Sequence, residues 1–106
     1  MICVILESPY AGNTDTNVKY ARRCMIDSLN NGEAPFLSHL LYTQCLDDTI
    51  PSQRKMGTEA GWEWIKNSDK TVVYQDYGIS PGMAEGIKRA KSMGKTIEYR
   101  TIGKNN

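Results

Sequence analysis

Three carboxylates occupy positions in this chain where acid–base or nucleophilic chemistry is feasible. Glu7 follows the first apolar run, Asp76 ends a later one, and Glu85 lies within GISPGMAEGIKRAKSMGK. A carboxyl group whose pKa is raised by burial can act as a general acid or base, and an ionised one can act as a nucleophile. Each also has an ordinary interpretation: a solvated strand end, a turn-starting aspartate, or a helix glutamate paired with Lys88 or Arg89.

Other polar and aromatic residues cluster in the same three segments of the sequence. The lone histidine, His39, sits among apolar residues in PFLSHLLY, where a structural hydrogen bond and a ligand contact are both reasonable roles. We expect a ligand site made of Glu7, Ser8, Tyr10, Asn13, His39, Asp76, Tyr77, Ser80, Gly82 and Met83.

The elements that must position these residues follow from the apolar periodicity and from the helix start and stop residues. Ile2–Leu6 is almost continuously apolar, which is typical of a strand buried on both faces of a parallel sheet. The sequence then predicts a helix over 13–29, a strand over Pro35–Leu41, a helix over Pro51–Lys66, a strand over Lys70–Asp76, a helix over 81–93 and a strand over Thr96–Thr101.

Strands alternating with helices predict an α/β fold with right-handed crossovers. We expect one domain over residues 1–106, a doubly wound, Rossmann-like or flavodoxin-like parallel sheet of about four strands in the order 2-1-3-4, with helices on both faces. Ligands of such sheets bind beyond the carboxyl ends of the strands. That rule selects the loops at 7–13, 38–39 and 76–83, which hold the candidate residues.

Composition narrows the classes of partner. The 13 Lys and Arg nearly balance the 12 Asp and Glu, which predicts neither nucleic acid nor membrane as a partner. Three cysteines without a Cys-x-x-Cys pair, together with one histidine, predict no metal site, and we expect no cofactor and a reduced, cytoplasmic protein. The edge strands and YTQCLDDTI (42–50) leave apolar groups uncovered, which favours a homodimer or higher homo-oligomer.

Two motifs carry a resemblance to a known family. The loop SPYAG (8–12) after a short first strand, and the late pattern formed by Gly82, Ala90, Gly94 and Lys95, resemble the nucleoside 2-deoxyribosyltransferase superfamily. That superfamily includes nucleoside-5′-monophosphate N-glycosidases, and the chain looks most like its small, phage-type relatives of unassigned function. The resemblance implies a nucleotide-type ligand.

The family's catalytic position is altered in this sequence. In the enzymes of the superfamily a helix glutamate, four residues after the loop glycine and four before the alanine, attacks the anomeric carbon. That position is Gly86 here, and the neighbouring Glu85 is rotated by about 100° on a helix. Ser80-Pro81-Gly82 resembles the Ser-x-Gly with which the monophosphate N-glycosidases hold phosphate, as suits a helix start.

Several functions therefore remain open from the sequence. The leading hypothesis is a nucleotide-binding protein without the usual glycosyl-transfer chemistry, which a phage could use to sequester a nucleotide signal of host defence. The alternative is an N-glycosidase or deoxyribosyltransferase that acts through Glu7, Asp76 or Glu85 in a rearranged site. A purely structural or interaction domain is a third possibility. AGNTDT (11–16) is also similar to a flavodoxin phosphate loop, but flavodoxins are longer and have five strands.

Overall fold

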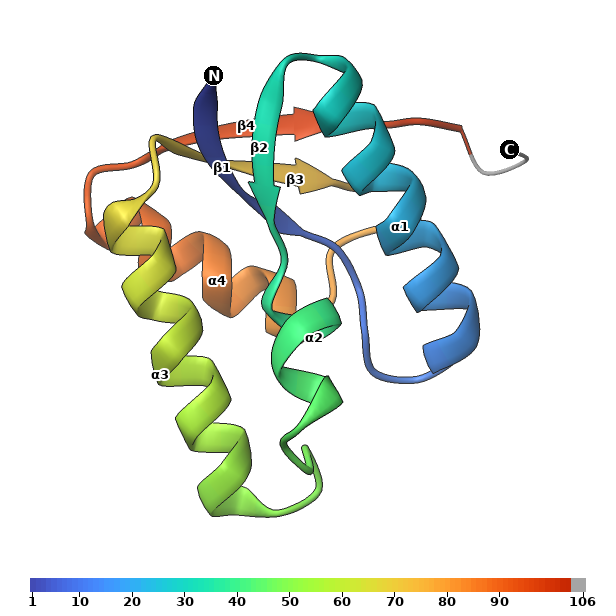
Figure 1. Ribbon diagram of the computed structural model, residues 1–106, viewed down its shortest axis with the longest axis vertical. Coiled ribbons are helices and arrows are strands. Elements are labelled where there is room, and N and C mark those ends of the chain that lie inside the picture. The colour runs from blue at the N-terminus through green and yellow to red at the C-terminus, as the bar shows by residue number, and fades with distance from the viewer. Residues whose placement is uncertain (104–106) are drawn as a thin grey trace.

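The structure, a computed structural model, describes residues 1–103 and consists of one parallel sheet flanked by helices (Figure 1). The elements are β1 (Ile2–Glu7), α1 (Thr14–Asn30), β2 (Glu33–Phe36), α2 (Ser38–Leu41), the 3₁₀ helix η1 (Tyr42–Gln44), α3 (Pro51–Asn67), β3 (Lys70–Tyr74), α4 (Pro81–Ser92) and β4 (Thr96–Arg100). The strand order is β2-β1-β3-β4, as predicted, and every pair is parallel.

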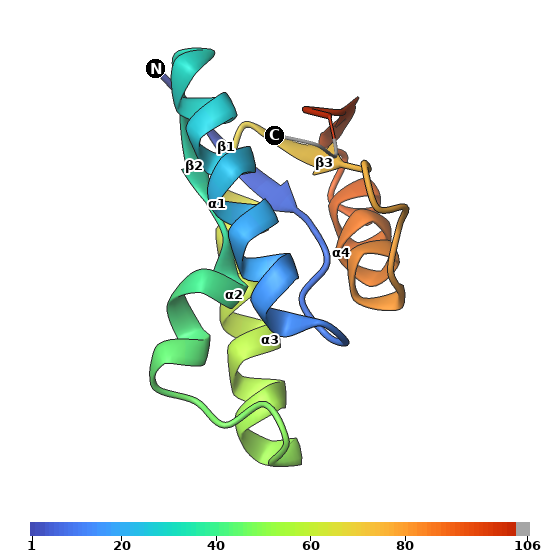
Figure 2. The ribbon, with the colours of Figure 1, turned by 90° about the vertical axis from the view of Figure 1, so that its right-hand side faces the viewer.

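The central strands are the most apolar ones. Val4, Leu6 and Val72 are almost completely buried, because β1 and β3 have a strand on either side and helices on both faces. The even-numbered side chains of these strands pack on α1 through Tyr20, Ala21 and Cys24. The odd-numbered ones pack on α3 and α4. Figures 1 and 2 show α1 on one side of the sheet and α3 with α4 on the other. Glu7, an odd-numbered residue, therefore points toward α3 and α4.

The second strand is shorter than predicted, and the expected span over Pro35–Leu41 is wrong. The strand runs from Glu33 to Phe36, and its last pair with β1 is Ile5↔Phe36. As an edge strand it has only β1 as a neighbour, and β1 turns away after Glu7. The chain then forms α2 and η1, where Thr43 Oγ1 donates to the carbonyl of His39 at 2.7 Å. A short apolar run does not separate strand from helix, which explains the error.

The third strand also ends early, at Tyr74 instead of Asp76. The helix ends agree closely with the sequence signals: Asn13 caps α1, Ser80 caps α4, and Pro81 opens α4. Ser80 Oγ accepts a hydrogen bond from the Met83 N–H at 3.2 Å, which fixes the start of α4 beside the end of β1.

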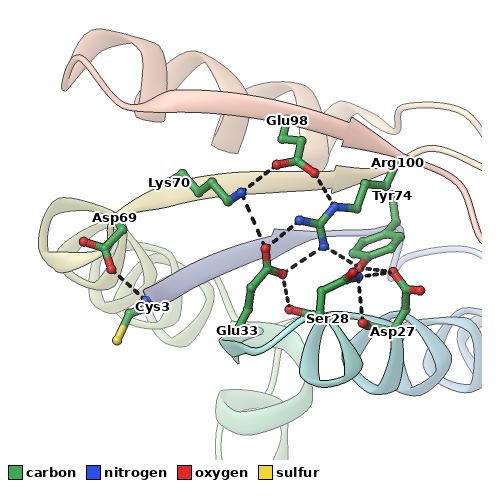
Figure 3. A network of polar contacts seen from close by, with 10 residues as sticks. Cys3, Asp27, Ser28, Glu33, Asp69, Lys70, Tyr74, Glu98 and Arg100 are labelled. Carbon is green, nitrogen blue, oxygen red and sulfur yellow. Dashed lines mark hydrogen bonds and ion pairs between the residues drawn. The ribbon is translucent and has the colours of Figure 1, made fainter. Parts of the chain in front are cut away.

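The charged side chains on the α1 face of the sheet form ion pairs with one another (Figure 3). Arg100 donates to Glu33 and Glu98, and Lys70 forms ion pairs with the same two carboxylates. The pKa of Glu33 falls to about 2, mainly because of its hydrogen bonds from Arg100. None of these residues lines the ligand cavity described below, so this network belongs to the fold.

Within residues 1–103, no helix is long and apolar enough to cross a membrane.

Candidate functional site

A cavity of about 710 Å³ opens at the carboxyl end of β1, on the face covered by α3 and α4. Its walls come from the β1–α1 loop, the α2–η1 segment, the side of α3 and the first two turns of α4. We call it the Glu7 cavity, after the carboxylate that lines it. A volume of this size suits a ligand of nucleotide dimensions. Of the predicted site residues, it brings together Glu7, Ser8, Tyr10, His39, Ser80, Gly82 and Met83, and it also includes Glu85.

Glu7 meets α4 at Gly86. A Cβ atom built on Gly86 would lie 2.1 Å from Oε2, 2.6 Å from Cδ and 2.9 Å from Oε1 of Glu7. These distances are far below van der Waals contact, so the carboxyl group of Glu7 fills the space that a side chain at position 86 would need. The glycine is required by this close approach, since its backbone conformation in α4 is ordinary for any residue.

The surroundings of Glu7 favour its neutral form. Burial raises its pKa to about 8. Within residues 1–103 its carboxyl group has no hydrogen-bond or ion-pair partner, and Arg54 is the one Lys or Arg among the described residues that line the cavity. An unpartnered carboxyl group in a cavity is free to bind a ligand, and at neutral pH it is a hydrogen-bond donor.

Ser8, His39 and Tyr10 form the wall beside Glu7. Ser8 Oγ and His39 Nε2 are 3.2 Å apart, and the rings of Tyr10 and His39 lie 5.3 Å apart, tilted by 45°. Burial lowers the pKa of His39 to about 4, so its imidazole is neutral near pH 7. The ring therefore serves as a neutral polar and aromatic surface.

The N-terminal turn of α4 also lines the cavity, with Ser80, Pro81, Gly82 and Met83. The N–H of Gly82 lies in the first turn of the helix, where backbone donors have no partner inside the helix. The positive end of the helix dipole adds to this preference for negative charge. Glu85 lines the same wall but is exposed, whereas Gly86 next to it is buried.

Three predicted site residues lie outside the cavity. Asn13 caps α1, where its Oδ1 accepts from the Thr16 N–H at 3.2 Å. Asp76 is buried and accepts from the Tyr20 hydroxyl and from the backbone N–H groups of Ile102 and Gly103. Tyr77 packs on Tyr20, with ring centroids 4.5 Å apart.

The hydrogen bonds of Asp76 also oppose its use in acid–base chemistry. Burial tends to raise its pKa, but the donors from Tyr20, Gly103 and Ile102 hold the pKa below its ordinary value. Asp76 is therefore an ionised carboxylate that binds the segment after β4 to the loop after β3, and the prediction that it lines the ligand site is wrong for this cavity.

The sequence did not identify the aromatic wall contributed by β2, η1 and α3. Trp62, Tyr42 and Phe36 all line the cavity, as do Gln53 and Arg54 at the start of α3. Trp62 packs with Ile5 and Ile65 and carries the guanidinium of Arg89 4.0 Å above its ring, whereas Trp64 is half-exposed and stacks on Phe36. Two tryptophans at positions i and i+2 of a helix cannot face the same way, and here Trp62 is partly buried against the core while Trp64 is exposed. The only signal that this helix lines a site is the pair Gly57 and Gly61, which also face the cavity.

Comparisons with known proteins agree with this architecture. Residues 2–100 match the model of the family described as Domain of unknown function (DUF7768), and the chain belongs to that family. No curated protein matches the sequence. Among solved structures, a 2-deoxyribosyltransferase from Bacillus psychrosaccharolyticus is similar with a TM-score of 0.68 and 18% identity, over 98% of this chain and 75% of that one. The Clostridium botulinum CMP N-glycosidase BcmB is similar with a TM-score of 0.59 and 19% identity, over 98% of this chain and 72% of that one. The chain thus has the deoxyribosyltransferase fold.

Proposed function

We propose that this member of the family binds a nucleotide or another phosphorylated, nucleoside-type small molecule in the Glu7 cavity. The two solved structures described above are of proteins named for nucleoside or nucleotide chemistry. A phage-encoded chain of this kind would be able to sequester a nucleotide signal in the host.

The observation that carries the proposal is the pairing of two unlike walls in one cavity. Tyr10, Tyr42 and Trp62 supply flat apolar surface, on which a base can stack. The first turn of α4, which lines the same cavity, supplies a backbone donor and a helix dipole at Ser80-Pro81-Gly82, which suit a phosphate. Glu7 and Ser8, at the end of β1, line the same cavity and supply polar groups that can bind the base or the sugar.

Thermal unfolding with a panel of nucleoside monophosphates and their parent nucleosides tests the proposal. A ligand at a hundredfold its dissociation constant should stabilise the folded chain by about 2.7 kcal/mol. We expect a monophosphate to stabilise more than its nucleoside, and Tyr10→Ala to reduce that effect. Tyr99→Ala is the matched control, because Tyr99 is half-exposed on β4 and does not line the cavity. The proposal fails if no compound raises the unfolding temperature at millimolar concentration.

A second candidate function is hydrolysis of the bond between base and sugar, and Glu7 is the observation that favours it. Pure binding does not require a neutral carboxyl group without a partner in the cavity wall, whereas cleavage of a glycosidic bond can use one. Chromatography of the free base released from each monophosphate tests this function. Covalent transfer through α4 is disfavoured, because the helix presents Gly86 to the cavity.

A further inference from the structure

We propose that Glu7 is the proton donor of this site and that it acts from the end of β1 in the space that α4 leaves open at Gly86. The inference rests on the second candidate function, hydrolysis of the N-glycosidic bond of a bound nucleotide. Glu7, at the end of a strand, occupies the space that a side chain at position 86 of α4 would fill. The role that we assign to its carboxyl group is general acid catalysis.

The position of the carboxyl group is the first support. Its three terminal atoms all lie within 2.9 Å of where a Cβ of residue 86 would be, and both residues line the cavity. Any side chain on Gly86 would displace Glu7. Gly86 and Glu7 therefore depend on each other: the glycine leaves a space beside α4, and the carboxyl group of Glu7 fills it.

The second support is that no charged group among residues 1–103 forms an ion pair with the Glu7 carboxyl group. The titratable and charged groups that line the same cavity come from the elements around it: Tyr10 from the β1–α1 loop, His39 from α2, Tyr42 from η1, Asp48 from the loop before α3, Arg54 from the start of α3, and Glu85 from α4. His39 is hydrogen bonded to Ser8, and none of these groups forms an ion pair with Glu7 among residues 1–103. Burial without a cation is what raises the pKa of Glu7 to about 8.

The reaction balances with water as the co-reactant. The Glu7 hydroxyl transfers its proton to a nitrogen or oxygen of the base while the bond from C1′ to the base breaks, and the bonding electron pair leaves with the base. Water then forms a bond to the cationic C1′ and returns a proton to the Glu7 carboxylate. The products are the free base and a phosphorylated sugar, and the acid is regenerated. No covalent glycosyl–protein ester forms.

The test of this role for Glu7 is to measure release of free base from a nucleoside monophosphate. The proteins compared are the wild type and the variants Glu7→Gln and Glu63→Gln. Gln keeps the size of Glu7 but has no acidic proton, so we expect release to fall by at least about 100-fold, a typical contribution of general acid catalysis. Glu63 is exposed on α3 outside the cavity, so Glu63→Gln should release base at the wild-type rate. We expect kcat/KM for the wild type to decrease above about pH 8, because the deprotonated acid cannot donate.

Two further readouts separate failure of this inference from failure of the proposed binding. Ligand-induced thermal stabilisation should persist in Glu7→Gln, since the variant retains the walls that hold base and phosphate. Stabilisation of the wild type without base release would overturn the inference and leave binding intact, whereas absence of both would overturn the two together. A sugar ester on Glu7 in intact-protein mass spectra, or a kcat/KM that rises toward pH 8, would make Glu7 a nucleophile and overturn its role as acid.

Discussion

The carboxyl group of Glu7 occupies the space of an absent side chain on Gly86, with Oε2 2.1 Å from where a Cβ would be. We predict that Gly86→Ala is destabilising by about 1–3 kcal/mol, the usual cost of overpacking a filled site. The cost should largely disappear in the double variant Glu7→Ala/Gly86→Ala, because the clash is removed. Urea unfolding of both single variants and the double variant measures this coupling.

Gly82→Ala is the control for that cycle. Gly82 lies in the same helix, and the atom nearest to a Cβ added at this position would be Ser80 Oγ, at 4.0 Å. The methyl group should therefore be neutral or stabilising by up to about 1 kcal/mol, as alanine is in helices. Additive free energies for positions 7 and 86 would show that the two residues do not share one space.

The raised pKa of Glu7 predicts a specific dependence of stability on pH. The folded chain holds the Glu7 proton up to about pH 8, whereas the unfolded chain releases it near 4.5. The stabilisation is therefore complete below about 4.5 and is lost as the pH rises to about 8, at up to about 1.4 kcal/mol per pH unit.

Subtracting the Glu7→Gln curve from the wild-type curve isolates this effect. His39, whose pKa is lowered to about 4, contributes the opposite slope below pH 6.5 in both proteins and cancels. The measurement is the free energy of unfolding in urea between pH 4 and 9. A flat difference would show that Glu7 is ionised in the folded state.

Much of this fold follows from short-range signals in the sequence. The runs ICVIL and KTVVY predict the central strands, and Pro51, Ser80 and Pro81 predict helix starts because capping and proline geometry act within one turn. The strand order follows from burial of the two most apolar strands. The segment PFLSHLL was assigned to a strand because nothing local shows that an edge strand has no partner beyond Phe36.

The site was less predictable because it depends on distances between remote segments. The rule that ligands bind at the carboxyl ends of strands selects Glu7, Ser8 and Ser80, and all three line the cavity. The same rule included Asp76, whose oxygens are taken by Tyr20 and by backbone groups after β4. The spacing from Gly82 and to Ala90 identified Gly86, but the side chain that fills the space beside it, Glu7, lies 79 residues earlier in the chain, as positions 86 and 7 show.

The network around Glu33 should make the fold sensitive to acid. Hydrogen bonds from Arg100 lower the pKa of Glu33 to about 2, so its stabilisation is present above about pH 4.5 and is lost as the pH falls toward 2. Glu33→Gln should cost about 3 kcal/mol at pH 7, because one partner of a buried ion pair is removed. The difference from wild type should shrink between pH 4.5 and 2 in urea unfolding.

Glu59→Gln provides the comparison for the Glu33 variant. Glu59 also forms an ion pair, with Lys55 at 4.0 Å, but both side chains are largely exposed on α3. Its loss should cost less than about 0.5 kcal/mol at any pH. Equal effects of the two substitutions would contradict a structural role for the buried network.

Exposed apolar side chains beside the cavity predict self-association. Leu41, Ile50, Met56 and Trp64 are between 39% and 60% exposed on α2, the following loop and α3. We expect sedimentation velocity to show a dimer at micromolar concentration and Met56→Glu to shift it toward monomer. Ile26→Glu, an equally exposed position on α1, should leave the dimer intact. A wild-type chain that sediments as a monomer at all concentrations would refute the prediction.

Asp76 should contribute to stability without contributing to ligand binding. Its carboxylate accepts hydrogen bonds from the Tyr20 hydroxyl, from the Ile102 N–H at 3.0 Å and from the Gly103 N–H at 2.7 Å. Asp76 does not line the cavity. Asp76→Ala leaves these donors without an acceptor, so we expect a loss of about 3 kcal/mol in urea unfolding. At a temperature where the variant is folded, a nucleoside monophosphate should raise its unfolding temperature as much as it raises that of the wild type. Loss of that response with stability unchanged would show that Asp76 contacts the ligand, because a purely structural residue cannot alter binding while leaving the stability of the fold unchanged.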